Sequence, residues 1–295
     1  MRAWVGRKSI GSKLFDGFNY IFLTLFALFT VVPFLHILSV SLSDAQALKV
    51  KAFILLPTDF SLDAYRYIFS LETVPRSLLV TAGITVVGTV VNLVFTLTMA
   101  YSLARKSLVG RRSIMLVVLF SMLFNGGMIP TYLLIRQLGM LDTYWALLLP
   151  GAISAFNLII IKNFFQQLPP GLEESAKIDG ANDVAILFRI VLPLSLPVIA
   201  TFTLFYAVGH WNTFFTAIMY MNDTSKWPIQ VVLRQIVIVS SQLGESAEFD
   251  ASEISSLSES IKMSVIVVAT LPILLLYPFL QKYFVKGVLL GSIKG

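Results

Sequence analysis

The chain has no cysteine and only two histidines among its 295 residues. Disulfide bonds, thiolate catalysis and thiolate metal sites are therefore excluded, while the redox compartment stays open. Charged residues make up only 13% of the sequence, and hydrophobic residues make up 57%. A soluble domain with a charged surface does not have this composition, so the sequence predicts an all-α membrane protein that crosses the bilayer several times.

Patterns for catalysis and nucleotide binding are also missing. Residues 6–13 (GRKSIGSK) are similar to a phosphate-binding loop but lack its Gly-Lys-Ser/Thr ending and follow no strand. Two histidines without clustered carboxylates offer no metal site or nucleophile. We therefore expect that the chain is not an enzyme alone and binds no cofactor. The net charge of +6 does not indicate nucleic acid, because the basic residues sort by membrane side.

Six apolar stretches are long enough to cross a bilayer, which takes about 20 helical residues. We predict one transmembrane domain over residues 1–295 with spans at about 18–42, 77–103, 113–135, 144–165, 194–221 and 263–284. The third span is interrupted at Asn125-Gly126-Gly127 and Pro130. Such a break leaves backbone groups unpaired, so we expect it within protein, at the interface or beside a water-filled path.

The distribution of positive charge predicts the orientation. Six spans place both termini on one side. Fourteen of the 22 Lys and Arg residues lie in or next to the N-terminus, the 105–112 loop, the 168–193 loop and the tail, which leaves eight for the other side. Cytoplasmic loops carry the excess of Lys and Arg, so we expect both termini in the cytoplasm and the 43–76 and 222–262 loops outside.

The polar loop 168–193 separates two apolar spans. Pro169, Pro170 and Gly171 are expected to break the preceding helix. Glu173 and Glu174 then fall in the first turn of a new helix, where carboxylates suit the partial positive charge of the helix start. A short cytoplasmic helix is therefore predicted.

The same loop contains signals for a bend. Gly180 can take the left-handed conformation that ends a helix, and Asn182 can cap the next one. We therefore predict two short helices with a narrow apolar surface, too small for a core of its own, which docks into another protein. Its apolar residues are Ala176, Ile178, Ala181 and Phe188.

Three stretches of this loop resemble the EAA loop of permease subunits of bacterial ATP-binding-cassette importers: Glu174-Ser175-Ala176, Asp179-Gly180-Ala181 and Ile190-Val191-Leu192-Pro193. Ser175 departs from the alanine usual in that family. The resemblance implies a MetI-like permease fold with six transmembrane helices, in which the loop is a coupling helix that sits in a cleft of the ATPase subunit. The coupling residues would be Glu174, Ser175, Ala176, Asp179, Gly180, Ala181, Leu192 and Pro193.

Three further stretches resemble the carbohydrate branch of this family, close to the polysaccharide- and oligosaccharide-uptake permeases of the MalG-like subgroup: 125–132 (NGGMIPTY), 209–212 (GHWN) and 281–287 (QKYFVKG). The resemblance implies a subunit of an ATP-driven importer in the bacterial cytoplasmic (inner) membrane. It would translocate an oligosaccharide delivered by a periplasmic or lipid-anchored solute-binding protein. Its partners would be a second permease subunit and two ATPase subunits, which bind ATP and Mg.

A sugar needs polar groups along its path, because amides pair with hydroxyls and aromatic rings stack on pyranoses. Buried Asn and Trp also often serve only to hold helices together, and this alternative stays open. An acidic sugar would be expected to require a cation, which within 209–212 only His210 could supply. The candidate path residues are Asn92, Asn125, Tyr206, His210, Trp211 and Asn212.

Other functions compete with sugar import. An ion-coupled secondary carrier is disfavoured because the predicted spans carry almost no acidic residues. An importer permease for a non-sugar solute and a membrane scaffold with large external loops are further alternatives. The tail 286–295 is expected either to be disordered or to contact the ATPase subunits.

Overall fold

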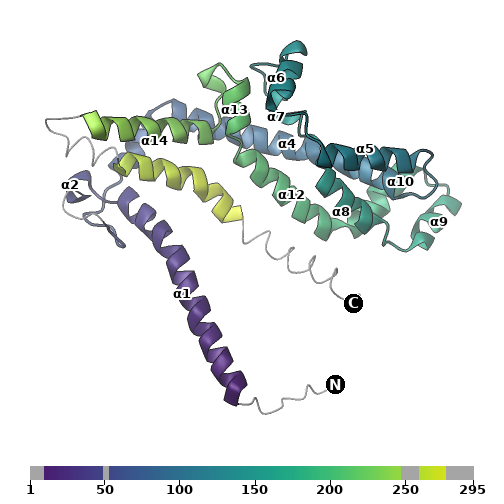
Figure 1. The fold of residues 1–295 in the computed structure, drawn as a ribbon, viewed down its shortest axis with the longest axis horizontal. Helices are drawn as coiled ribbons and strands as arrows, with labels where there is room; N and C mark the ends of the chain where they lie inside the picture. Colours follow the sequence, from purple (N-terminus) through teal and green to yellow (C-terminus); the bar gives the residue numbers. More distant parts are fainter. Residues whose placement is uncertain (1–9, 49–52, 247–258, 277–295) are drawn as a thin grey trace. The chain divides into compact units, whose positions relative to one another are not determined.

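The computed structural model describes residues 10–48, 53–246 and 259–276 (Figure 1). This described part is helical and contains no strand, only one isolated bridge between Ser43 and Phe60. It divides into two compact units, residues 1–71 with 236–268 and residues 72–235 with 269–295. The predicted all-α architecture is therefore confirmed for the described residues.

The first unit begins with α1 (Ile10–Ser41), followed by α2 (Ala45–Leu48) and α3 (Asp63–Ser70). α1 starts eight residues before the predicted span at 18, because residues 10–17 contain no proline to stop the helix. At its other end, the Ser41 hydroxyl lies 2.8 Å from the Tyr65 hydroxyl, and Ser264 donates to the Ser41 carbonyl over 3.3 Å.

The core of the second unit is formed by α4 (Thr73–Ala104), α8 (Ala155–Phe165) and α12 (Leu196–Trp211), which pack against one another (Figure 1). The buried face of α4 carries small or hydroxyl-bearing residues such as Gly88 and Thr96, which allow neighbouring helices to approach closely. Its opposite face exposes valine and leucine side chains, as expected for a helix surrounded by lipid or by other apolar helices.

The third predicted span is broken as expected. α5 (Arg111–Leu123) and α6 (Met128–Gln137) are bent by 116° across residues 124–127. Gly127 has φ of +89°, and its N–H donates to the Asn125 side chain over 2.9 Å. Pro130 lies in the first turn of α6, where a missing N–H does not interrupt the helix.

The fourth and fifth predicted spans are not single helices. α7 (Trp145–Leu148) is separated from α8 by the non-helical residues 149–154, which include Pro150. Proline lacks an N–H and disfavours helical geometry in the residue before it, which explains this break. α12 is followed by the non-helical residues 212–214 and then α13 (Phe215–Tyr220).

Three described helices are long and apolar enough to cross a membrane, namely α1, α4 and the helix over Glu259–Leu276. The number rises to five if the bent pair α5–α6 and the pair formed by Asp183–Leu194 with α12 each count as one span. The total of six spans stays a prediction, and the last predicted span extends past residue 276, outside the described residues. α14 (Ile229–Ser246) follows the 3₁₀ turn η2 (Thr224–Lys226).

Candidate functional site

The predicted bent pair of helices is α9 (Pro170–Ile178) and α10 (Asp183–Ile186), which lie at one end of the α4–α8–α12 core (Figure 1). α9 begins at Pro170, earlier than predicted, because a proline in the first helical position loses no hydrogen bond. Only Glu173 therefore lies in the first turn. The placement of Glu174 in that turn is wrong, and this carboxylate is exposed one position further along.

The turn between the two helices confirms both predicted signals. Gly180 has φ of +80°, and its N–H donates to Lys177 over 3.0 Å while the Ala181 N–H donates to Ala176 over 2.9 Å. This pair of bonds is a Schellman motif, which satisfies the last carbonyls of α9. The Asn182 side chain then accepts from the Ala185 N–H over 2.8 Å and caps α10.

The apolar residues of the loop do not form the single docking face that the sequence predicts. Ala176 is buried in the hydrophobic core of the second unit, and Ala181 packs against the same core. Ile178 and Phe188 are 86% and 61% exposed. The small alanines thus attach the loop to its own chain, because only small side chains fit so close to the core. Leu192 also packs inward, whereas the remaining candidate coupling residues are exposed: Glu174, Ser175, Asp179, Gly180 and Pro193.

An arginine absent from the sequence-based prediction joins this loop to α4. Arg105 follows the last residue of α4 and lies 2.6 Å from Asp183 (Nη1 to Oδ2) and 3.5 Å from Glu173 (Nη2 to Oε2). The hydrogen bond from Arg105 lowers the pKa of the Asp183 carboxyl, which therefore stays ionised at neutral pH. The only sequence signal was a basic residue in the 105–112 loop, which does not reveal its partners.

At the middle of α4, Asn92 connects three elements. Its Nδ2 donates to the carbonyls of Gly151 (2.6 Å) and Ala152 (3.1 Å), and its Oδ1 lies 2.5 Å from His210 Nε2 on α12. The interruption between α7 and α8 frees these carbonyls, and an unpaired carbonyl at membrane depth is costly. Asn92 therefore provides hydrogen bonds to two carbonyls of the break and links this break to α12.

The other candidate path residues are found in two different situations. Tyr206 and Trp211 are buried, where the Tyr206 hydroxyl meets Thr96 Oγ1 at 2.8 Å and Trp211 Nε1 donates to the Ala269 carbonyl over 2.9 Å. Asn125 and Asn212 lie at helix breaks and are exposed. The structure brings together Asn92 and His210, and no hydrogen bond between described residues joins any other two of the six.

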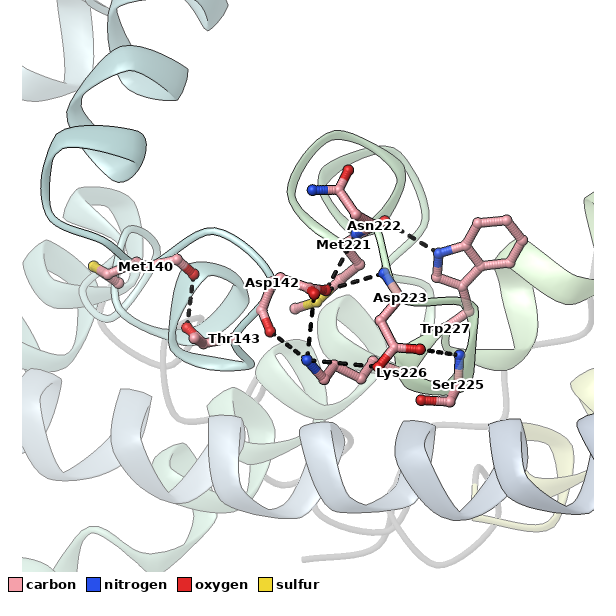
Figure 2. A network of polar contacts seen from close by, with 9 residues as sticks. All are labelled: Met140, Asp142, Thr143, Met221, Asn222, Asp223, Ser225, Lys226 and Trp227. Atoms are coloured by element: carbon pink, nitrogen blue, oxygen red, sulfur yellow. Dashed lines mark hydrogen bonds and ion pairs between the residues drawn. The ribbon is translucent and has the colours of Figure 1, made fainter.

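A second polar network ties the segment before α7 to the turn after α13 (Figure 2). Asp142 has φ of +61°, and its Oδ1 accepts from the N–H groups of Asn222 (3.2 Å) and Asp223 (3.1 Å). Lys226 donates to the Asp142 carbonyl over 2.8 Å and lies 3.4 Å from its Oδ2. The left-handed backbone of a non-glycine residue is thus held by four contacts from one neighbouring segment.

Replacing Asp142 tests this network. Asp142→Val removes all side-chain acceptors and places a β-branched residue at positive φ, so we expect a loss of about 1–3 kcal/mol in stability. Asp142→Asn tolerates this conformation and keeps an acceptor oxygen, so its effect should be smaller. Thermal unfolding of the purified complex in detergent measures both variants, and equal losses would contradict the assignment.

Comparisons with known proteins agree along nearly the whole chain. Residues 2–290 match the family described as "Binding-protein-dependent transport system inner membrane component". The polygalacturonan/rhamnogalacturonan transport system permease protein YtcP of Bacillus subtilis (strain 168) is 59% identical over 288 residues, 96% of this chain and 99% of that protein. Protein LplC of the same strain is 55% identical over 283 residues, 96% of each.

A solved structure is similar as well. It is the crystal structure of a bacterial ABC transporter involved in the import of the acidic polysaccharide alginate. One of its chains superposes with a TM-score of 0.87 and 33% identity, over 95% of this chain and 100% of that one. The similarity therefore includes both the fold and the sequence.

Proposed function

The chain belongs to the family of inner membrane components of binding-protein-dependent transport systems, and from this premise we propose that it is a transmembrane subunit of an ATP-driven importer for acidic oligosaccharides. Membership confirms the predicted helical permease fold of the MetI-like type and the resemblance to carbohydrate importer permeases. The chain is accordingly a transport component.

The observation that carries the substrate class is the 59% identity to a permease named for polygalacturonan and rhamnogalacturonan. Polygalacturonan is a polymer of a sugar acid, so each of its residues carries a carboxylate at neutral pH. The solved structure that is 33% identical belongs to a transporter of another acidic polysaccharide. Two relatives of high coverage thus support a negatively charged oligosaccharide as the solute.

The energy source in this proposal is a pair of ATPase subunits that bind ATP and Mg. The exposed part of the 168–193 loop, with Glu174, Ile178 and Phe188, is the surface that these subunits would contact. Their closure would draw this loop towards that of a second permease subunit and switch the pair between inward- and outward-open states. A solute-binding protein delivers the sugar outside, and both chain termini lie in the cytoplasm. The predicted tail contact involves residues 286–295, outside the described part.

An ion-coupled carrier is the alternative that the structure supports less. The three core helices α4, α8 and α12 contain no Asp or Glu in their sequences. Carriers driven by protons or sodium usually place a carboxylate or a broken-helix ion site at this depth. In the break at 149–154, the carbonyls of Gly151 and Ala152 already accept from Asn92.

Reconstitution of the complete complex in proteoliposomes tests the proposed function. We expect ATP-dependent uptake of trigalacturonate in the presence of the solute-binding protein. The fully methyl-esterified trisaccharide is the matched control, because it keeps the sugar ring and loses the charge. Equal uptake of both compounds would contradict an acidic substrate, and uptake of trigalacturonate without ATP would contradict the energy source.

A cation suited to an acidic sugar lies beside the helix break after α12. Arg234 on α14 is exposed, and its guanidinium carbon lies 4.9 Å from the centroid of the Phe214 ring. Among the described residues, no carboxylate pairs with Arg234, in contrast to Arg66 and Arg76. The exposed Asn212 lies in the same break as Phe214. An arginine, an aromatic ring and an amide are the groups that a uronate would bind.

We expect Arg234→Gln to raise the KM for trigalacturonate-stimulated ATP hydrolysis about tenfold, because one charge-assisted hydrogen bond contributes about 1.5–3 kcal/mol. Arg66→Gln is the matched control, since Arg66 is an exposed arginine already paired with Asp63. Saturation curves against the sugar-loaded solute-binding protein give both KM values. If the two variants behave alike, Arg234 does not contact the sugar.

A further inference from the structure

We propose that Arg105 fastens both helices of the coupling loop to α4, so that α9, α10 and the end of α4 move as one body when the ATPase subunits move. The inference rests on the proposed function, because it assigns to this residue the transmission of that movement. Arg105 is a positioning residue in this role and touches neither sugar nor nucleotide.

The first argument is the position of its two carboxylate partners. Glu173 belongs to α9 and Asp183 belongs to α10, on opposite sides of the Gly180 turn. A single guanidinium therefore bridges the two helices across the turn at Gly180. Arginine suits this task better than lysine, because its planar group presents several N–H donors in fixed directions. The loop cannot open at Gly180 without breaking one of these ion pairs.

The second argument is the anchoring of Arg105 itself. Its side chain is only 15% exposed, compared with 33% for Glu173 and 62% for Asp183. The guanidinium carbon lies 4.5 Å from the centroid of the Tyr101 ring, and the guanidinium also donates to the Tyr101 hydroxyl. Tyr101 is one turn earlier on α4 and is buried in the core. The arginine is thus fixed to the helix, and the loop is fixed to the arginine.

The third argument is the set of hydrogen bonds that α4 forms further from the loop than Tyr101. Thr96 meets Tyr206 of α12, and Asn92 meets His210 of α12 and the carbonyls of the 149–154 break. The helix α4 is continuous from Thr73 to Ala104. A displacement at Arg105 is therefore transmitted along the continuous helix α4 to Thr96 and Asn92 and to the groups that these residues bind.

The apolar contacts of the loop do not provide the same link. Ala176 and Ala181 pack against the core through methyl groups, and such van der Waals contacts are not directional. Neighbouring basic residues do not take this role either. Lys106 is exposed, and Arg111 donates through Nε to the Leu103 carbonyl over 2.9 Å. Among the described residues, Arg105 is the cation that pairs with both helices of the loop.

Transport by the complete complex in proteoliposomes tests this role. We expect Arg105→Gln to lower the amount of trigalacturonate imported per ATP hydrolysed about tenfold, because it removes two charge-assisted contacts. Arg76→Gln is the matched control: Arg76 lies in the first turn of the same helix and forms an exposed pair with Glu72 at 3.0 Å. This control should keep the parent ratio.

A double-mutant cycle separates transmission from simple stabilisation. Asp183→Asn should also lower the ratio of import to hydrolysis, and adding it to Arg105→Gln should cause little further loss, because the interaction is already absent. Additive losses would overturn the proposal. A lower yield of assembled complex with an unchanged ratio in Arg105→Gln would show that the arginine only stabilises the fold, which also overturns it.

A measurement that needs no sugar tests the role of Arg105 independently of the proposed substrate. The chain has no cysteine, so spin labels can be introduced with Leu172→Cys on α9 and Val94→Cys on α4, both at exposed positions. In the complex with the ATPase subunits, we expect the same distance distribution with and without ATP, and a broadened one after Arg105→Gln. A distance that changes with ATP in the parent contradicts this inference, whereas a parent that does not import trigalacturonate contradicts only the proposed substrate.

Discussion

Gly88→Ala is expected to disrupt the packing of α4 against α12. A methyl group at this position would lie 2.5 to 2.8 Å from ring atoms of His210, closer than any carbon contact allows. The ring cannot simply turn away, because its Nε2 lies 2.5 Å from Asn92 Oδ1. Overpacking of a close contact costs about 1–3 kcal/mol. We therefore expect a clearly lower melting temperature of the complex and reduced uptake.

The matched control is Gly83→Ala on the same helix, where no heavy atom lies within 4 Å of the added methyl group. This variant should keep the parent stability. A second comparison uses the His210→Ala background, in which the ring is absent and Gly88→Ala should cost little. If Gly88→Ala is equally damaging in both backgrounds, the contact with the ring is not the reason for glycine at this position.

Gly180→Val is expected to abolish sugar-stimulated ATP hydrolysis in the complete complex. Gly180 has φ of +80°, which costs about 1–2 kcal/mol for a residue with a Cβ and more for a β-branched one. No heavy atom lies near the position of its missing Cβ, so the effect comes from the backbone alone. Loss of the Schellman motif would release the end of α9 and move Asp183 away from Arg105.

Two variants calibrate this prediction. Gly180→Asn should be milder, because asparagine adopts the left-handed conformation more readily. Gly171→Ala, in the first turn of α9, should have no effect, since its added methyl group meets no neighbour and its φ is not positive. ATP hydrolysis with and without sugar-loaded solute-binding protein provides the readout. Full stimulation in Gly180→Val would contradict a rigid turn.

The local features of the loop could be predicted from the sequence because they depend on neighbouring residues. The left-handed Gly180, the cap at Asn182 and the break at 124–127 each follow from the chemistry of a few adjacent positions. The start of α9 was missed because proline both ends one helix and begins another, and the sequence does not distinguish the two roles.

The contacts between distant segments could not be predicted. Asn92 and His210 are 118 residues apart, and their pairing depends on how closely α4 and α12 approach at Gly88. Arg105 counted only as positive charge in a cytoplasmic loop, because its carboxylate partners lie on helices whose direction the sequence leaves open. Ala176 and Ile178 both suit an apolar surface, and only the packing of α9 shows that the first is buried and the second exposed.

The contacts of Asn92 also have a consequence for biogenesis. Its amide binds carbonyls 59 and 60 residues later in the chain and a histidine 118 residues later. At a synthesis rate of about 5–20 residues per second, the carbonyls emerge roughly 3–12 s after Asn92 and the histidine roughly 6–24 s after it. During that interval α4 carries an unsatisfied amide at membrane depth. We therefore expect the nascent helix α4 to remain beside the insertion machinery until these carbonyls and the histidine have been inserted.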